Sequence, residues 1–383
     1  MKKAIVVSPY AHLAGHHWSV MEKLVRYMQS KGVVVDGGVT CFSQHIKNES
    51  GIHARAILPK WQCIYQLLGE RLLHYKKIQS ILQNLETFMI LIWANKHTRK
   101  NQSVIYCVDA RHVILALFVI FTRQRYVHYL WGMYENKHNV AGRIKILLYK
   151  WAFDTGRLDF IAETNDVEIS WRDVGARTAV IPYAIEKEFS DNLPDRHDSR
   201  KQLGLDLNKR IFLLFGTHRQ DKDYRTVIRA AKVLLQRDFA VHLVFAGAVI
   251  SENDPVKLLQ EEDFSEATVI TGYVDEQKTR LLFAASDAVI LPYPKDYKKG
   301  SGVLLEAVCH ERPVIVSSGG YLESFVTTYS TGLSYKPADS DDLANVLMDQ
   351  RLMNCFWGTE RFKRVKDEYS WSTLIERHLS FLD

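Results

Sequence analysis

The sequence predicts an α/β protein of two doubly wound domains, and three observations support that prediction. The chain has 383 residues, more than one hydrophobic core usually supports, so two domains of roughly 150 to 200 residues are expected. Short apolar segments alternate with stretches of helical periodicity in both halves, which is typical of parallel sheets covered by helices on both faces. A polar segment rich in Asp, Glu, Asn and Pro separates the two series at residues 185–201.

The first half opens with a β-branched strand at Ala4–Ser8, a loop that contains glycine, and a helix from about Trp18 to Ser30. Apolar residues recur at helical spacing in that last stretch. The same order then repeats. We expect further strands at Val33–Cys41, Val104–Val108, Tyr126–Trp131 and Arg177–Pro182, and helices at Trp61–Trp93 and His112–Phe121.

The second half repeats the pattern after the polar segment. We expect strands at Arg210–Phe215, Val241–Ala246, Ala267–Ile270, Ala288–Leu291 and Pro313–Ser317. Helices are expected at Tyr224–Gln236, Gln277–Ala285, Val303–His310 and Ser340–Arg351. The domains are therefore predicted at residues 1–183 and 184–367.

Cysteine usage and hydropathy indicate a cytoplasmic protein. The five cysteines are widely spaced, with no CxxC pair and no Cys/His cluster at zinc spacing. The amino-terminal apolar run is too short for a signal peptide. The longest apolar runs, Phe88–Ala94 and Val113–Phe121, fall far below the roughly 18 residues that span a bilayer.

The formal net charge of +6 is unevenly distributed. Residues 1–150 hold 21 Lys and Arg against 7 Asp and Glu, a net of +14, and the remainder carries −8. Such asymmetry predicts an anionic partner for the first half, and we expect an acidic membrane surface rather than nucleic acid. The basic residues lack the frame of a known nucleic-acid motif, and a merely solvated basic face is the simpler alternative.

The strongest local motif is the segment 298–307, KKGSGVLLEA, in which small residues follow a strand and open an apolar helix. Free backbone N–H groups at such a helix start suit a phosphate or diphosphate. Glu306 is expected in the first helical turn, where it can accept hydrogen bonds from a diol such as ribose. A plain turn with a dipole-stabilising Glu is the alternative.

A second motif, FGTHRQDK at 215–222, leaves the first strand of the second half and enters its first helix. Ligands of open α/β sheets bind outside the carboxyl ends of the strands, so Arg219 and Lys222 are placed to neutralise a diphosphate. Both are equally compatible with solvated loop charges. In the first half, Gly15 and His16 occupy the first strand-to-helix loop, and the adjacent His17 completes no recognisable metal-ligand set.

Taken in order, these segments resemble the retaining, nucleotide-sugar-dependent glycosyltransferases of the GT-B fold, in particular the GT4-like family of bacterial sugar-polymer enzymes. The similarity is best over residues 205–340. It rests on the segments Phe215–Lys222, Thr271–Val274, Ala285–Tyr293, Gly300–Glu306, Pro313–Ser317 and Gly319–Glu323. It implies two Rossmann-like domains that face each other across a cleft. It also implies that a terminal helix at about 368–383, which begins near Tyr369-Ser370-Trp371, returns to the first domain.

The resemblance also implies roles for individual residues. Lys222 and Arg219, with the backbone of Ser301, Gly302 and Val303, are expected to stabilise the departing diphosphate, and Glu306 to hold ribose. Gly15 and His16 are expected near the diphosphate or acceptor. The expected substrate-binding set also includes Gly216, Tyr273, Lys298 and Gly300.

The implied reaction is hexosyl transfer from a nucleotide diphosphate sugar, a co-substrate, to a hydroxyl of a glycan, lipid-linked or small-molecule acceptor. We expect it to proceed with retention, with no metal required, in bacterial polysaccharide or glycoconjugate synthesis. The leaving phosphate is expected to take the acceptor proton. The implied location is cytoplasmic or peripheral on the inner face of the cytoplasmic membrane.

Three departures from the family pattern leave an alternative open. Thr217, Lys298 and Trp131 replace an expected Arg, Glu and His. Lys298 predicts either a donor sugar with an acidic group, such as a uronic acid, or a shifted loop whose lysine faces solvent. The departures also fit a catalytically silent GT-B subunit that binds and positions a partner glycosyltransferase.

Overall fold

The computed structural model describes residues 2–11, 17–41, 54–58, 76–101, 103–130, 140–185, 193–250, 252–295, 297–353 and 359–383. The chain folds into two compact domains. The first domain comprises Met1–Pro182 and Trp371–Asp383, and the second comprises Tyr183–Ser370.

The first domain contains a parallel sheet. In the described part of the chain its strand order is β3-β2-β1-β4-β5-β6-β7, and β1 pairs with β2 so that Lys3 lies opposite Val34. The strands span β1 Lys3–Ser8, β2 Val34–Val39, β3 Ala54–Ala56, β4 Val104–Val108, β5 Tyr126–Leu130, β6 Leu158–Ala162 and β7 Arg177–Val180.

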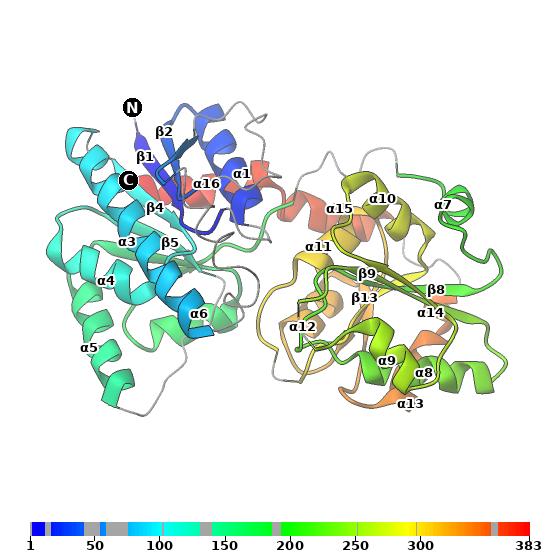
Figure 1. The fold of residues 1–383 in the computed structure, drawn as a ribbon. Helices are drawn as coiled ribbons and strands as arrows, with labels where there is room; N and C mark the ends of the chain where they lie inside the picture. Colours follow the sequence, from blue (N-terminus) through cyan, green and yellow to red (C-terminus); the bar gives the residue numbers. More distant parts are fainter. Residues whose placement is uncertain are drawn as a thin grey trace. The chain divides into compact units, whose positions relative to one another are not determined.

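Helices cover both faces of this sheet (Figure 1). They span α1 His17–Ser30, α3 Lys76–Asn101, α4 His112–Phe121, α5 Val140–Asp154, α6 Asn165–Arg172, α16 Trp371–Leu379 and the 3-10 turn η2 Ser380–Leu382. Residues of α3, α4, α5 and α6 form one hydrophobic core with the sheet. Helix α16 packs beside α1 although the two come from opposite ends of the chain, and the Tyr27 ring stacks on Trp371 at 5.8 Å.

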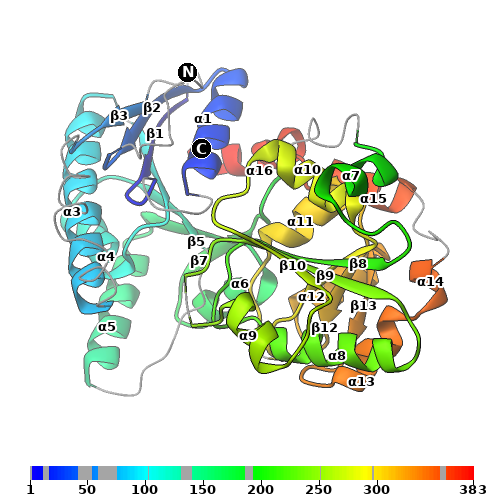
Figure 2. The same cartoon turned by 45° about the vertical axis from the view of Figure 1, so that its right-hand side comes forward.

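The second domain holds another parallel sheet, with the order β10-β9-β8-β11-β12-β13 among its described residues. Its strands span β8 Arg210–Phe215, β9 Val241–Gly247, β10 Ala267–Thr271, β11 Ala288–Leu291, β12 Val314–Ser317 and β13 Gly332–Tyr335. Its helices (Figure 2) span α7 Arg196–Leu203, α8 Tyr224–Gln236, α9 Pro255–Glu261, α10 Glu276–Ala285, α11 Gly302–Cys309, α12 Tyr321–Tyr329, α13 Ser340–Leu347, α14 Gln350–Met353 and α15 Thr359–Glu368.

Helix starts in the second domain follow from local sequence. An Asp side chain accepts a backbone N–H in the first turn of α7, α8, α9, α10 and α13, which satisfies an amide that has no partner inside the helix. The capping residues are Asp195, Asp223, Asp254, Asp275 and Asp339.

The predicted fold class, α/β with two doubly wound Rossmann-like domains, is confirmed. Three strands were not predicted from the sequence, namely β3, β6 and β13. Strands β3 and β13 are very short, and β6 carries Asp159 within an apolar run. The helix predicted at Ser340–Arg351 is divided into α13 and α14. Of the helix predicted at Trp61–Trp93, residues 61–75 lie outside the described residues.

Helix α3 has 26 residues, but five of them are Lys or Arg. Among the described helices, none is both long and apolar enough to cross a membrane.

Candidate functional site

A cavity of about 800 Å³ lies at the carboxyl edge of the second domain's sheet. It is formed by the segments that follow β8, β9, β11, β12 and β13. Open α/β sheets bind ligands at this edge, because successive loops diverge there and leave a crevice. The lining residues include Lys222, Tyr224, Asn253, Tyr293, Ser318 and Lys336.

Glycines allow the loops at this edge to approach closely. Gly216 has φ +84° directly after β8, and Gly247 has φ +149° at the end of β9. A Cβ at Gly247 would lie 2.2 Å from the carbonyl oxygen of Gly216. One at Gly216 would lie 3.1 Å from Cγ2 of Val303, at the start of α11. The predicted loop at 215–222 and the predicted helix start at 301–303 are therefore neighbours.

Lys222 is the central cation of this edge. Its side chain is 6% exposed, and Nζ donates to the carbonyl oxygen of Phe215 at 2.9 Å. Burial away from water lowers the pKa of its ammonium to about 8. An ammonium has three hydrogens to donate, and Phe215 supplies its one acceptor among the described residues.

The loop that carries Lys222 is fixed by an amide that the sequence did not reveal. Asn253 Nδ2 donates to the carbonyl oxygens of Lys222 at 2.7 Å and Arg219 at 2.9 Å. Asp223 caps α8, and its N–H donates to the carbonyl of Pro292 after β11. Asn253 belongs to no motif and follows a different strand, so no sequence signal linked it to this loop.

Arg219 is placed differently from Lys222. Its guanidinium donates to both carboxylate oxygens of Asp221, at 3.0 and 2.9 Å, and lies 6.0 Å from the centre of the Tyr293 ring. Part of its charge is thus neutralised within the loop. Its role toward a diphosphate stays a prediction.

The start of α11 is held by a capped turn and an aromatic stack. Tyr293 is buried and stacks on Tyr297 at 3.9 Å, and the Tyr297 hydroxyl donates to the carbonyl of Gly300 at 3.0 Å. Ser301 is the N-cap, and its Oγ accepts the N–H of Leu304 at 3.4 Å. Gly302 and Val303 therefore form the first turn of α11, as the motif predicts.

Glu306 corrects one expectation. Helix α11 begins at Gly302, so Glu306 lies in the second turn and its carboxylate is not placed at the helix start. This carboxylate lies 3.7 Å from Nδ1 of His310, which is buried and stacked on Phe283. Burial lowers the pKa of His310 to about 4, so the imidazole is uncharged at neutral pH and forms no ion pair with Glu306.

Of the other predicted residues, some are exposed to solvent and some lie outside the described residues. Tyr273, after β10, is 93% exposed, and Lys298 is exposed as well. Gly15, His16 and Trp131 lie outside the described residues.

At the carboxyl edge of the first domain, Asp109 follows β4 with φ +57°, a conformation that favours glycine. Its neighbour Ala110 donates its N–H to Nε2 of the buried His128 at 2.9 Å. Burial raises the pKa of Asp109 to about 6.

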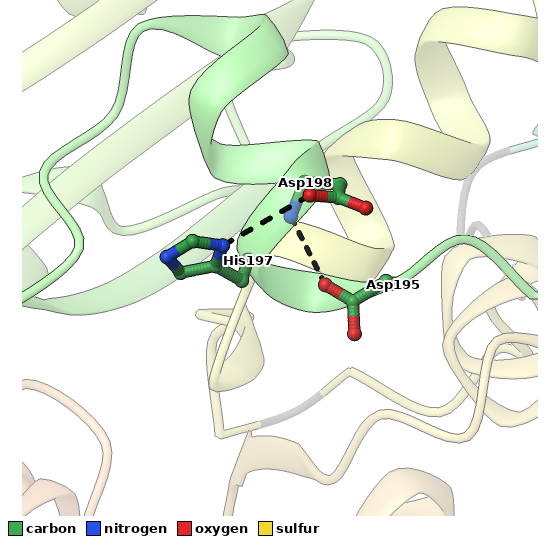
Figure 3. Close-up of side chains that lie close together, drawn as sticks. All are labelled: Asp195, His197 and Asp198. Carbon is green, nitrogen blue, oxygen red and sulfur yellow. Dashed lines mark hydrogen bonds and ion pairs between the residues drawn. The ribbon is translucent and has the colours of Figure 1, made fainter.

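One group of exposed side chains has the composition of a metal site. Asp195, His197 and Asp198 lie together at the start of α7 (Figure 3). Asp195 acts as the helix cap and accepts the N–H of Asp198 at 3.0 Å, while His197 Nδ1 lies 3.9 Å from the Asp198 carboxylate. Capping accounts for this arrangement. That no metal is required stays a prediction.

The chain was found to be similar to a protein family and to a curated protein. Residues 195–351 match the family model described as glycosyl transferases group 1. An uncharacterized glycosyltransferase of Methanocaldococcus jannaschii is 27% identical over 201 residues, which is 49% of each chain. The chain thus spans about half the length of this curated relative.

Solved structures extend the likeness in fold to the whole chain. Sucrose-phosphate synthase of Thermosynechococcus elongatus shares 17% identity at a TM-score of 0.73, over 99% of this chain and 98% of that one. Anabaena HepE in complex with UDP shares 15% at a TM-score of 0.73, over 100% and 99%. Residues 195–351 thus match the glycosyl transferases group 1 family, and the chain as a whole has the GT-B fold of these solved structures.

Proposed function

We propose that this protein transfers a hexosyl group from a nucleotide diphosphate sugar to a hydroxyl acceptor. The observation that carries the proposal is Lys222, a buried ammonium at an 800 Å³ cavity with hydrogens left to donate. A buried cation is costly unless an anion compensates it, and a diphosphate is such an anion. The family match covers this residue, and HepE, of the same fold, was solved with UDP.

The proposed chemistry relies on electrostatic stabilisation of the leaving group. Negative charge grows on the diphosphate as the bond to the sugar breaks, and fixed donors aimed at that charge lower the barrier. Lys222 and the free amides of Ser301, Gly302 and Val303 would supply those donors, with Arg219 released from Asp221 as a further cation. Glu306 would accept hydrogen bonds from ribose.

The remaining details follow the family resemblance. We propose retention of anomeric configuration, with the leaving phosphate taking the acceptor proton. Gly15 and His16 would lie near the diphosphate or acceptor, and no metal would be required. To test whether Lys298 selects an acidic sugar, turnover of a nucleotide hexose is compared with turnover of the matching nucleotide hexuronic acid. Both are measured in the wild type and in Lys298→Glu.

The proposed setting is bacterial polysaccharide or glycoconjugate synthesis in the cytoplasm, with a glycan, lipid-linked or small-molecule acceptor. The basic first domain favours peripheral attachment to an anionic membrane. A lipid-linked acceptor would be reached directly from that position.

A silent GT-B subunit that positions a partner enzyme is the second candidate. The pairing of Arg219 with Asp221 favours it, because that cation is already compensated without a ligand. Isothermal titration with UDP and other nucleoside diphosphates separates the two. An enzyme should bind one of these diphosphates and hydrolyse or transfer the sugar of the matching nucleotide sugar. If the folded chain gives no heat of binding with any of them, the protein is a silent subunit.

A further inference from the structure

The outer helices of the first domain expose apolar side chains in an ordered pattern. On α3, four large apolar residues lie on one helix face, at spacings of four, three and one. Helix α5 shows the same arrangement at spacings of four, three and four. With the end of α4 they form what we call the α3–α5 apolar surface: Ile81, Leu85, Phe88, Met89, Phe121, Val140, Ile144, Leu147 and Trp151.

Aromatic contacts make the surface continuous across the three helices. Phe88 of α3 meets Phe118 of α4 with ring centres 5.6 Å apart, and Phe121 at the end of α4 meets Trp151 of α5 at 6.2 Å. Figures 1 and 2 show the three helices side by side on the same flank of the first domain. Phe121, Ile144 and Leu147 are 75%, 61% and 68% exposed.

The charges that border this surface are predominantly positive. The face of α3 that carries the apolar residues is bounded by Lys77 and Lys96, and exposed Arg143 and Lys150 flank the apolar face of α5. The three helices hold eight Lys and Arg and only two acidic residues, Glu86 and Asp154. Glu86 is fully buried, so Asp154 is the single exposed carboxylate on these helices.

We propose that the α3–α5 apolar surface inserts into the interface of an anionic lipid bilayer. Amphipathic helices that expose Trp, Phe and Leu beside Lys and Arg bind bilayers in the interfacial plane, with the apolar residues below the headgroups and the cations among anionic lipids. Two copies of this chain that met through the surface would instead bring like charges together. Charge complementarity therefore selects the bilayer over a second copy.

This inference rests on the membrane attachment proposed above and goes beyond it, because it assigns the attachment to apolar insertion at named residues. The full chain is tested by cosedimentation with vesicles of phosphatidylcholine alone and of equimolar phosphatidylcholine and phosphatidylglycerol, at low and high salt. Ile144→Ser with Leu147→Ser should weaken binding to the mixed vesicles on the order of tenfold. Arg143→Gln with Lys150→Gln should lose a similar factor, confined to low salt.

The matched control changes two exposed apolar residues in the second domain. Ile250 is 62% exposed, and Leu207 is exposed as well. Ile250→Ser with Leu207→Ser should leave vesicle binding unchanged.

Three results would overturn the inference. The first is wild-type protein that does not bind the mixed vesicles, and the second is unchanged binding by Ile144→Ser with Leu147→Ser. The third is a dimer in sedimentation equilibrium that this apolar variant abolishes while vesicle binding persists. Titration with UDP in the absence of lipid reports separately on the proposed donor chemistry, so loss of one property is distinguishable from loss of the other.

Discussion

The two domains share a doubly wound architecture and use different parts of it. The second domain concentrates its unusual features at the carboxyl edge of the sheet, where Gly216 and Gly247 bring loops together around the buried ammonium of Lys222. The first domain places its unusual features on the outer helices, where apolar residues line up on α3 and α5. Exposed apolar residues of the second domain, such as Leu207 and Ile250, are scattered over separate elements.

This difference shows that a shared fold does not determine which surface binds a partner. A sheet edge supplies backbone amides and fixed polar groups, which suit a small anion. Outer helices supply a broad face that tolerates substitution, which suits a large partner. This difference can be tested by substitutions in one domain, with the other domain or a matched site as the reference.

Removal of the buried cation is expected to have the largest effect. Lys222→Ala should lower kcat/KM for the donor. The decrease should correspond to a loss of transition-state stabilisation on the order of 2 to 4 kcal/mol. The variant should fold, because it removes a buried charge. Steady-state turnover checks this, with Lys257→Ala on α9 as a control of equal charge change at an exposed site. Wild-type turnover in folded Lys222→Ala would place the donor elsewhere.

Removal of the predicted ribose acceptor should have an effect of the same order or slightly smaller. Glu306→Ala deletes a partly exposed carboxylate whose charge His310 does not neutralise, and we expect a loss of about 2 kcal/mol in kcat/KM for the donor. Glu276→Ala, at the start of α10, is the matched control. If kcat/KM falls equally in both variants, Glu306 does not contact the donor.

The close approach of β8 and β9 is tested through stability. In Gly247→Ala the new Cβ would overlap the Gly216 carbonyl oxygen at 2.2 Å, so the free energy of unfolding should fall by about 2 to 3 kcal/mol. Gly204→Ala, in the same domain, has φ +66° and open space around it, and should cost only about 1 kcal/mol. Thermal unfolding measures both. Equal losses would mean that backbone strain, rather than the contact, determines the cost.

The lowered pKa of Lys222 predicts the smallest effect, a pH dependence with a definite sign. Its folded pKa of about 8 lies below its ordinary value of 10.5, so the unfolded chain binds more protons between these values. Stability contributed by this group therefore rises with pH from about 8 to about 10 and is absent below 8. Donor affinity should change in the opposite direction, because the free site loses its positive charge above pH 8 while the diphosphate stays ionised.

Calorimetric titration with UDP across this range measures that affinity and the proton uptake on binding. Lys222→Arg, which stays charged, should lose both the pH dependence and the uptake. An unchanged pH profile in this variant would assign the titration to another group.

Much of the second domain's edge could be predicted because its signals are local. Glycine and lysine spacing after β8 and the Ser-Gly pair before α11 reveal a loop and a capped helix start within a few residues. The position of Glu306 was one turn wrong, since the sequence does not say at which small residue the helix begins. Asn253 was missed because its partners, Arg219 and Lys222, follow another strand. The Tyr293–Tyr297 stack was missed as well, although both residues follow β11.

By itself the sequence determined the alternation of strands and helices, the basic charge of the first half and the loops of the proposed donor site. Tertiary structure alone decided which side chains are buried. Helix α5 has apolar residues around most of its circumference, and only packing on the sheet places Tyr149, Ala152 and Phe153 in the core. It leaves Ile144, Leu147 and Trp151 exposed. The physical reason is that burial depends on contacts between segments far apart in the chain, and helical periodicity does not determine which apolar face meets the sheet.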